Sequence, residues 1–222
     1  MNSPHPHRPA GGRLAALLGL LLPAVPTLAA ECPPALEPAT FEWEQFVVDP
    51  VIDNSQTQQW IQTQPGGNPR TRAQTRSHVQ TKIDLKFQYQ TDKLSGVTCA
   101  YLKKAKFLFA IDELRVFIPD RFKPGTCQFT TLETHEREHV ALSRAALQEA
   151  APQIEQEMRR AVQEVKPIPS EDKQKAGQAI GQPLAALLKT QKEAFNARHN
   201  ARQKTIDTPQ NYAVVEGYCP SW

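Results

Sequence analysis

The chain is short of the features that mark a membrane protein or a nucleic-acid-binding protein. Its longest apolar run, Leu14 to Leu22, has nine residues, whereas a transmembrane helix needs roughly 20. It also has no large surplus of positive charge, because 26 Lys and Arg stand against 23 Asp and Glu. We therefore expect neither a membrane-spanning segment nor a basic surface that holds nucleic acid.

The short apolar run has the setting of a secretory signal peptide. Arginines precede it, and Ala29 and Ala30 after it offer small side chains for cleavage. A membrane anchor is the alternative, but the run is too short for one. Cys32 follows closely, yet Glu31 directly before it does not suit lipid attachment. We predict that residues 1–30 are a signal peptide and that the mature protein is secreted or periplasmic, without membrane association.

Cleavage would leave residues 31–222, which is enough chain for a single domain. Removal of Arg8 and Arg13 leaves 24 basic residues (26 minus 2) against 23 acidic ones, so the mature chain is close to neutral. Nothing in the sequence indicates its oligomeric state.

Cysteine is scarce, and no two cysteines form a C-x-x-C pair. The four are Cys32, Cys99, Cys127 and Cys219. Isolated cysteines disfavour a structural zinc site, whereas an even number in an exported protein indicates two disulfides. Of the three possible pairings we favour Cys99–Cys127 with Cys32–Cys219.

The first half of the mature chain, residues 31–129, has the patterns of a β-sheet. Apolar and polar residues alternate from Val79 to Gln90, which predicts a strand with one buried face. Residues 62–77, rich in Pro, Gly and Asn, are expected to form an exposed loop. Further strand candidates are residues 46–48, 51–52, 97–101, 107–111 and 114–118. We predict an antiparallel sheet of three to five strands.

The second half, residues 130–222, is predicted to be helical. Thr130 and Glu133 form a capping box that opens a helix reaching about Val165, with a kink or break at Pro152. Ser170 can cap a second helical region that runs to about Lys204, and the tail beyond it is expected to be irregular. The predicted fold class is therefore α+β, with an antiparallel sheet followed by a long helical hairpin.

The first predicted helix carries the sequence His135-Glu136-Arg137-Glu138-His139. Residues four apart lie on one face of a helix, so two imidazoles at this spacing can bind one metal ion. A catalytic zinc usually has three protein ligands and an open position for water, whose proton a nearby carboxylate can accept. We predict that His135 and His139 are zinc ligands.

Helix geometry does not choose between Glu136 and Glu138 as the base, because they flank the two imidazoles symmetrically. The order His-Glu-x-x-His resembles the motif of gluzincin and metzincin peptidases, in which the first Glu is the general base. The resemblance implies that Glu136 has this role. The metzincin extension is absent, because Leu142 and Ala145 stand where its glycine and third histidine would be.

The third ligand has to come from elsewhere in the chain. If the two helical regions form a hairpin centred near Ile168, equal rise along both helices places His199 beside Arg137. His199 is thus the first candidate, although it also suits an ordinary surface histidine. Helix kinks blur this register by about a turn. The alternatives left open are Glu193, Asn196, Asp207 and, if the first helix breaks, Glu149.

Several of these features occur together in one known group of proteins. A leader, a β-rich half with cysteines, the approach Pro124 to Phe129, the motif His135 to Val140 and a polar helix succeed one another. The combination resembles uncharacterised bacterial proteins described as predicted secreted zinc-dependent proteases, over residues 79–147. This resemblance implies a zincin-like fold and a zinc-dependent hydrolase.

The function that we predict from the sequence is an exported zinc-dependent metallohydrolase, most directly a peptidase acting on peptides or proteins. Two alternatives remain. One is a non-catalytic periplasmic binding or assembly module that retains the helix without metal. The other is a metallohydrolase that cleaves a non-peptide amide bond, such as one in the cell wall.

Overall fold

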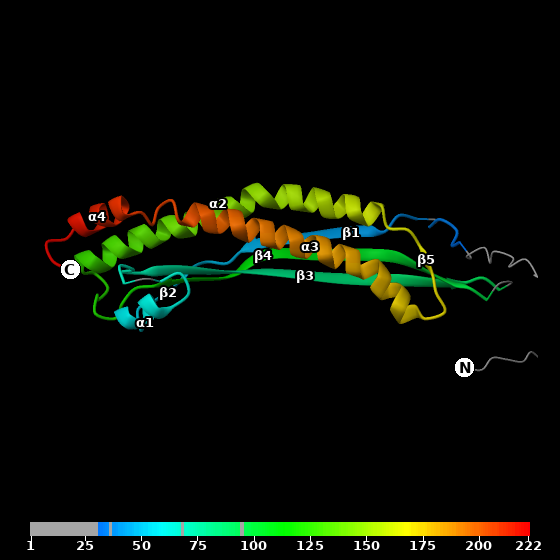
Figure 1. Ribbon diagram of the computed structural model, residues 1–222, viewed down its shortest axis with the longest axis horizontal. Coiled ribbons are helices and arrows are strands. Elements are labelled where there is room, and N and C mark those ends of the chain that lie inside the picture. The colour runs from blue at the N-terminus through cyan, green and yellow to red at the C-terminus, as the bar shows by residue number, and fades with distance from the viewer. Residues whose placement is uncertain (1–30, 36, 68, 94–95) are drawn as a thin grey trace, which may run out of the picture. The chain divides into compact units, whose positions relative to one another are not determined.

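The computed structural model describes residues 31–35, 37–67, 69–93 and 96–222, so the predicted signal peptide lies outside the described residues. Figure 1 shows the helices and strands of this part of the chain. In order they are β1 (Thr40–Val47), β2 (Val51–Asp53), α1 (Gln58–Thr63), β3 (Gln74–Thr91), β4 (Thr98–Phe117), α2 (Cys127–Gln163), β5 (Ile168–Pro169), α3 (Lys173–Gln203) and α4 (Pro209–Gly217).

The sheet is organised around β4, a strand of 20 residues that joins three segments predicted separately. Both β1 and β2 run parallel to β4, whereas β3 and the short β5 run antiparallel to it. The predicted antiparallel sheet followed by a helical hairpin is therefore wrong: the path β1-β4-β2 is parallel, and the described residues form four helices. Alternating hydrophobicity marks a strand and its buried face, but it carries no information on strand direction.

Helices α2 and α3 cover one face of the sheet (Figure 1). The alternation in β3 points Leu85 and Phe87 toward α3, where Gly181 and Gly177 leave room for them. A Cβ atom at Gly177 would lie 3.3 Å from the Phe87 ring, and one at Gly181 would lie 3.2 Å from Leu85 Cδ1. Small residues one helical turn apart thus let α3 approach the sheet closely. The core between the helices and the sheet includes the fully buried side chains of Phe107 and Phe109 from β4 and of Phe195 from α3.

The motif helix begins four residues earlier than the predicted capping box. Gly125 has a positive φ of 86°, and the next residue, Thr126, is extended. The Thr126 hydroxyl accepts a hydrogen bond from the Phe129 N–H, so Thr126 and not Thr130 is the N-cap. Helix α2 then continues through Pro152 without a break, since an internal proline removes one backbone hydrogen bond and not the whole helix.

Two boundaries in the second half of the chain also differ from prediction. Asp172, not Ser170, caps α3, because its carboxylate accepts from the N–H groups of Gln174 and Lys175. The tail is not irregular throughout, since it forms α4 with Thr208 as N-cap. Proline at the first position of α4 suits a helix start, where its missing N–H costs no hydrogen bond.

Two disulfides are present, as predicted, but their pairing is Cys32–Cys99 and Cys127–Cys219. The favoured pairing is wrong because parallel strands start at the same end. Thr40 pairs with Lys104, so the chain before β1 arrives beside the start of β4, where Cys99 lies. β4 has 20 residues and so spans roughly 65 Å, and Cys127 comes after its far end.

The disulfides indicate an oxidising environment, either extracellular or periplasmic. Among the described helices none is long and apolar enough to cross a membrane. The Cys127–Cys219 bond joins the start of α2 to the chain just after α4. A cross-link over such a loop typically stabilises a protein by about 2–4 kcal/mol, and here it ties the C-terminal segment to the motif helix.

Candidate metal centre

The three motif side chains lie on the inner face of α2, within its first four turns. His135 and His139 are each 6 % exposed and Glu136 is 2 % exposed. Potential metal-binding atoms of all three lie within 4.8 Å of one another. The two imidazole rings stand nearly perpendicular, with centroids 5.1 Å apart. One turn of helix therefore brings two nitrogen donors and a buried carboxyl together, as the spacing predicts.

Asp207, from the segment between α3 and α4, faces both imidazoles. Its Oδ1 atom lies 3.3 Å from His135 Nε2 and 3.0 Å from His139 Nε2. Ligands at about 2.05 Å in a tetrahedral zinc site are about 3.3 Å from each other. The separations of Asp207 Oδ1 from the two Nε2 atoms are thus close to the distance between two ligands of one zinc ion. Two imidazoles and a carboxylate are also a donor set that zinc accepts in catalytic sites, so these residues fit the ion.

The position of Asp207 follows from the register of α3 against α2. Three contacting pairs, His139 with Gln203, Ser143 with His199 and His135 with Asp207, are all symmetric about position 171. The hairpin expectation was centred on position 168. The difference shifts the partner of any α2 residue by six positions, roughly 9 Å along a helix. His199 is consequently opposite Ser143, and Asp207 is opposite the motif.

The connection between the helices explains this shift. Residues 164–172 do not form a tight turn, because Ile168 and Pro169 pair as β5 with Ala100 and Cys99 of β4. The chain therefore runs on beyond the last turn of α2 before α3 begins. A tight helical hairpin has no such extended connection. The short strand β5 was not predicted because it has only two residues.

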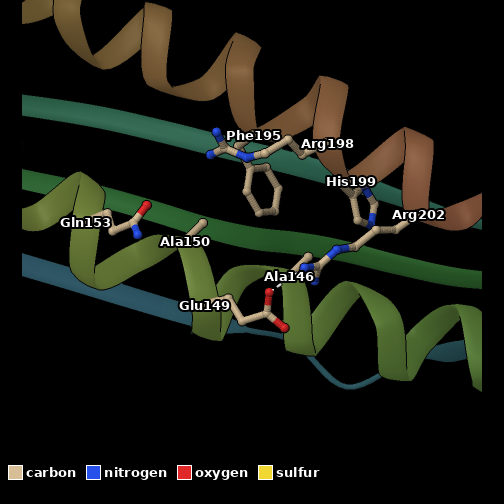
Figure 2. A pocket seen from close by; sticks show the side chains of 8 residues that line it. All are labelled: Ala146, Glu149, Ala150, Gln153, Phe195, Arg198, His199 and Arg202. Carbon is tan, nitrogen blue, oxygen red and sulfur yellow. Dashed lines mark hydrogen bonds and ion pairs between the residues drawn. The ribbon is translucent and has the colours of Figure 1, made fainter.

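His199, on α3, makes different contacts from those of the motif residues. It is 4 % exposed, it stacks on Phe195, and its Nε2 atom bonds Ser143 and Gln203. Figure 2 shows it at a cleft of about 240 Å³ between α2 and α3, beside Arg202. The structure therefore does not place the imidazole of His199 with those of the motif.

The remaining candidates for a third ligand are also elsewhere. Glu149 forms an ion pair with Arg202 on the surface, and exposed Glu193 lies near Lys189. Asn196 precedes His199 on α3, farther from the motif. Of the candidates that the sequence left open, Asp207 is the one brought to the two histidines.

No model of a protein family matches the chain, and no curated protein or solved structure is significantly similar to it. Sequence reasoning had no signal for Thr75, Ser143 or Gln203, which all bond to the motif residues. A hydroxyl or amide in a strand or helix looks like any other polar residue until its neighbours are known.

Glu136 is held in place by Thr75 of β3. The Thr75 hydroxyl lies 2.7 Å from Glu136 Oε2. Burial raises the pKa of Glu136 above its usual range, while His139, the Thr75 hydrogen bond and His135 oppose that rise. Glu138, by contrast, is exposed. The structure therefore distinguishes the two glutamates that helix geometry left equivalent, since Glu136 alone is buried beside the imidazoles.

Asp207 and His139 each shift the pKa of the other. Burial by itself lowers the pKa of His139, but the hydrogen bond to Asp207 and the charges of Glu136 and Asp207 raise it to about 9. Burial would raise the pKa of Asp207, yet hydrogen bonds from His135, His139 and Tyr212 bring it below its usual range. Asp207 is thus an anion, as a metal-binding carboxylate has to be.

Tyr212 of α4 donates a hydrogen bond to Asp207 Oδ1 at 3.0 Å, and its ring centroid lies 5.6 Å from that of His135. Burial, followed by the charge of Asp207, raises the pKa of Tyr212. Its hydroxyl therefore stays protonated near neutral pH and remains a donor beside the cluster.

Two pockets reach the cluster from the surface. One of about 370 Å³ is lined by His135, by threonines of α2 and by Val214 and Val215 of α4. Another of about 610 Å³ is lined by Asp207 and Tyr212 together with Arg72. A molecule bound in one of these pockets would therefore lie against His135 or against Asp207.

We expect replacement of Thr75 by Val to raise the pKa of Glu136. The hydroxyl favours the ionised form of Glu136, so its loss should move the titration of this carboxyl upward by about one pH unit, as followed by NMR. Thr75→Ser, which keeps the hydroxyl, is the matched control and should leave the titration in place. An unchanged titration in the Val variant would show that Thr75 does not tune Glu136.

Proposed function

We propose that this protein is an exported zinc-dependent peptidase. The observation that carries the proposal is the convergence of Asp207 on His135 and His139, with Glu136 buried alongside. Asp207 is 68 residues from His139 in sequence. If the two histidines were on a solvated helix by chance, a carboxylate from a distant part of the chain would not be expected beside both of them.

His135, His139 and Asp207 would hold the zinc ion. When bound, zinc would supply a Lewis acid that polarises the scissile carbonyl and makes water more acidic. The Glu136 carboxylate accepts the proton of the attacking water and later donates it to the leaving amine. The Tyr212 hydroxyl donates its hydrogen to Asp207 Oδ1 and so holds that ligand in place.

The surroundings of the site suit an extended peptide. Among the described residues, β3 pairs with β4 alone, so its other edge has no strand partner in this part of the chain. β3 passes the cluster at Thr75. A polypeptide that paired with that edge would cross the site with side chains near the two pockets, in the manner of strand addition.

Zinc content and proteolysis test the proposal together. The protein isolated from the exported fraction is analysed for metal and incubated with an unfolded protein substrate, and new peptide termini are identified by mass spectrometry. We expect one zinc ion per chain, loss of cleavage after treatment with a chelator, and recovery when zinc is restored.

Each part of that experiment has a contrary outcome. Absence of zinc in protein folded with excess metal would overturn the proposed centre and favour the non-catalytic module. Zinc binding without peptide cleavage, combined with cleavage of a cell-wall amide, would retain the centre but replace the substrate class. His135→Ala is the control for adventitious metal, since it should remove the bound ion.

A further inference from the structure

Gln203, the last residue of α3, contacts the ligand His139 at two points. Its Oε1 atom lies 2.5 Å from His139 Nδ1, and its Nε2 atom lies 3.1 Å from the backbone carbonyl oxygen of His139. One amide group thus spans both the ring and the main chain of a single residue. This arrangement has consequences for the protons of the ring.

The polarity of these hydrogen bonds follows from the carbonyl, which can only accept. The atom of Gln203 facing the His139 carbonyl has to be the amide NH₂, so the atom facing the ring is the amide oxygen. An amide oxygen accepts and never donates, so His139 Nδ1 carries a proton. In the neutral ring Nε2 is then the atom with the lone pair, and Nε2 is the atom 3.0 Å from Asp207.

Ser143 and His199 hold the amide of Gln203 from the other side. The Gln203 Nε2 atom lies 2.9 Å from Ser143 Oγ and 2.8 Å from His199 Nε2. Ser143 Oγ also lies 2.9 Å from the His139 carbonyl oxygen and 2.9 Å from His199 Nε2. The amide NH₂ has two hydrogens, which point at the His139 carbonyl and at His199 Nε2, while the Ser143 hydroxyl donates to the same carbonyl. His199 Nε2 therefore accepts and is unprotonated.

We infer that Gln203 is a positioning residue that sets the tautomer and orientation of His139 for metal binding, and that His199 acts through it by fixing the direction of the amide. A ligand histidine commonly donates its second N–H to such a partner, which fixes the ring and increases its basicity. The buried histidine singled out by the sequence thus serves the metal centre indirectly. The inference rests on the proposed zinc site.

Zinc affinity, measured by competition with a chromogenic chelator, tests the role of Gln203. We expect Gln203→Met, which keeps the length but removes the acceptor, to weaken zinc binding by about 10- to 100-fold. Gln203→Glu keeps an oxygen facing His139 Nδ1 and should recover most of that loss. Equal losses in both variants, with unchanged thermal unfolding, would overturn the inference, because packing alone would then explain them.

The role of His199 is tested by a double-mutant cycle. His199→Phe keeps the stacking on Phe195 but removes the acceptor for the amide, and it should weaken zinc binding less than Gln203→Met does. In the double variant the loss should equal that of Gln203→Met alone, since His199 acts through Gln203. Additive losses would show that His199 contributes independently.

A measurement without metal separates this inference from the proposed function. In the zinc-free protein with ¹⁵N-labelled histidine, the His139 Nδ1 proton should be visible by NMR and exchange slowly with water. In Gln203→Met it should exchange faster. If the native protein bound no zinc, the proposed function would be wrong. The NMR result would still test the contact between Gln203 and His139, because it needs no metal. Slow exchange in both proteins would remove the role of Gln203.

Discussion

Glu136→Gln should lower kcat/KM for peptide hydrolysis by about 10²- to 10⁴-fold, the usual contribution of a general base. Gln has the same size as Glu and can keep a contact with Thr75, but it cannot accept the proton of water. Glu136 is not one of the three proposed zinc ligands, so the variant should retain its zinc. Steady-state kinetics combined with elemental analysis of the same preparation measures both effects.

The motif supplies its own matched control. Glu138 lies two residues away on the same helix and lines the pocket at His135, but it is exposed and lies outside the buried cluster. Glu138→Gln should change turnover little. A similar loss in both variants would point to a general effect of charge near the site, and full activity in Glu136→Gln would remove Glu136 as the base.

Asp207→Ala should weaken zinc binding by at least about 100-fold. Loss of an outer partner of a ligand costs about 10- to 100-fold in metal affinity, and loss of a ligand itself should cost more. The substitution also removes a carboxylate whose Oδ1 atom lies within 3.3 Å of both imidazole Nε2 atoms. Competition with a chelator of known affinity gives the change, and circular dichroism checks that the fold is retained.

Three further variants make the Asp207 result specific. Glu193→Ala and Glu149→Ala remove the other acidic candidates, which are exposed and paired with cations, and both should bind zinc normally. Tyr212→Phe removes the hydroxyl that bonds Asp207 and should weaken zinc binding, but less than Asp207→Ala does. Zinc binding that survived Asp207→Ala but failed in Glu193→Ala would assign the third ligand to α3 itself.

How far the site could be predicted from the sequence depends on the distance over which its residues interact. His135 and His139 meet because a helix repeats every 3.6 residues, and that relation is local. The third candidate ligand depends on how two helices of 37 and 31 residues slide along each other. That register was misplaced by six positions because β5 carries the connection outward along the sheet. The direction of a hydrogen-bonded amide such as that of Gln203 was even harder to predict from the sequence.

The fold shows the same division. The strand at residues 79–90 was correctly predicted, because alternation of side chains reports a buried face directly. Parallel pairing of β1 with β4 was missed, and with it the pairing of the cysteines. The pairing of β1 with β4 depends on contacts between residues more than 60 positions apart, such as Thr40 and Lys104, for which a single sequence carries no signal.

By itself the sequence determined the helix with its paired imidazoles, the strand pattern and the expectation of an exported, disulfide-bonded chain, because each of these follows from neighbouring residues or from composition. Tertiary structure alone decided that Asp207 joins the histidines, that Glu136 rather than Glu138 is enclosed, and that His199 stands behind the site. These outcomes depend on the packing of α3 and the C-terminal segment against α2, which is set by the whole sheet and by the Cys127–Cys219 bond.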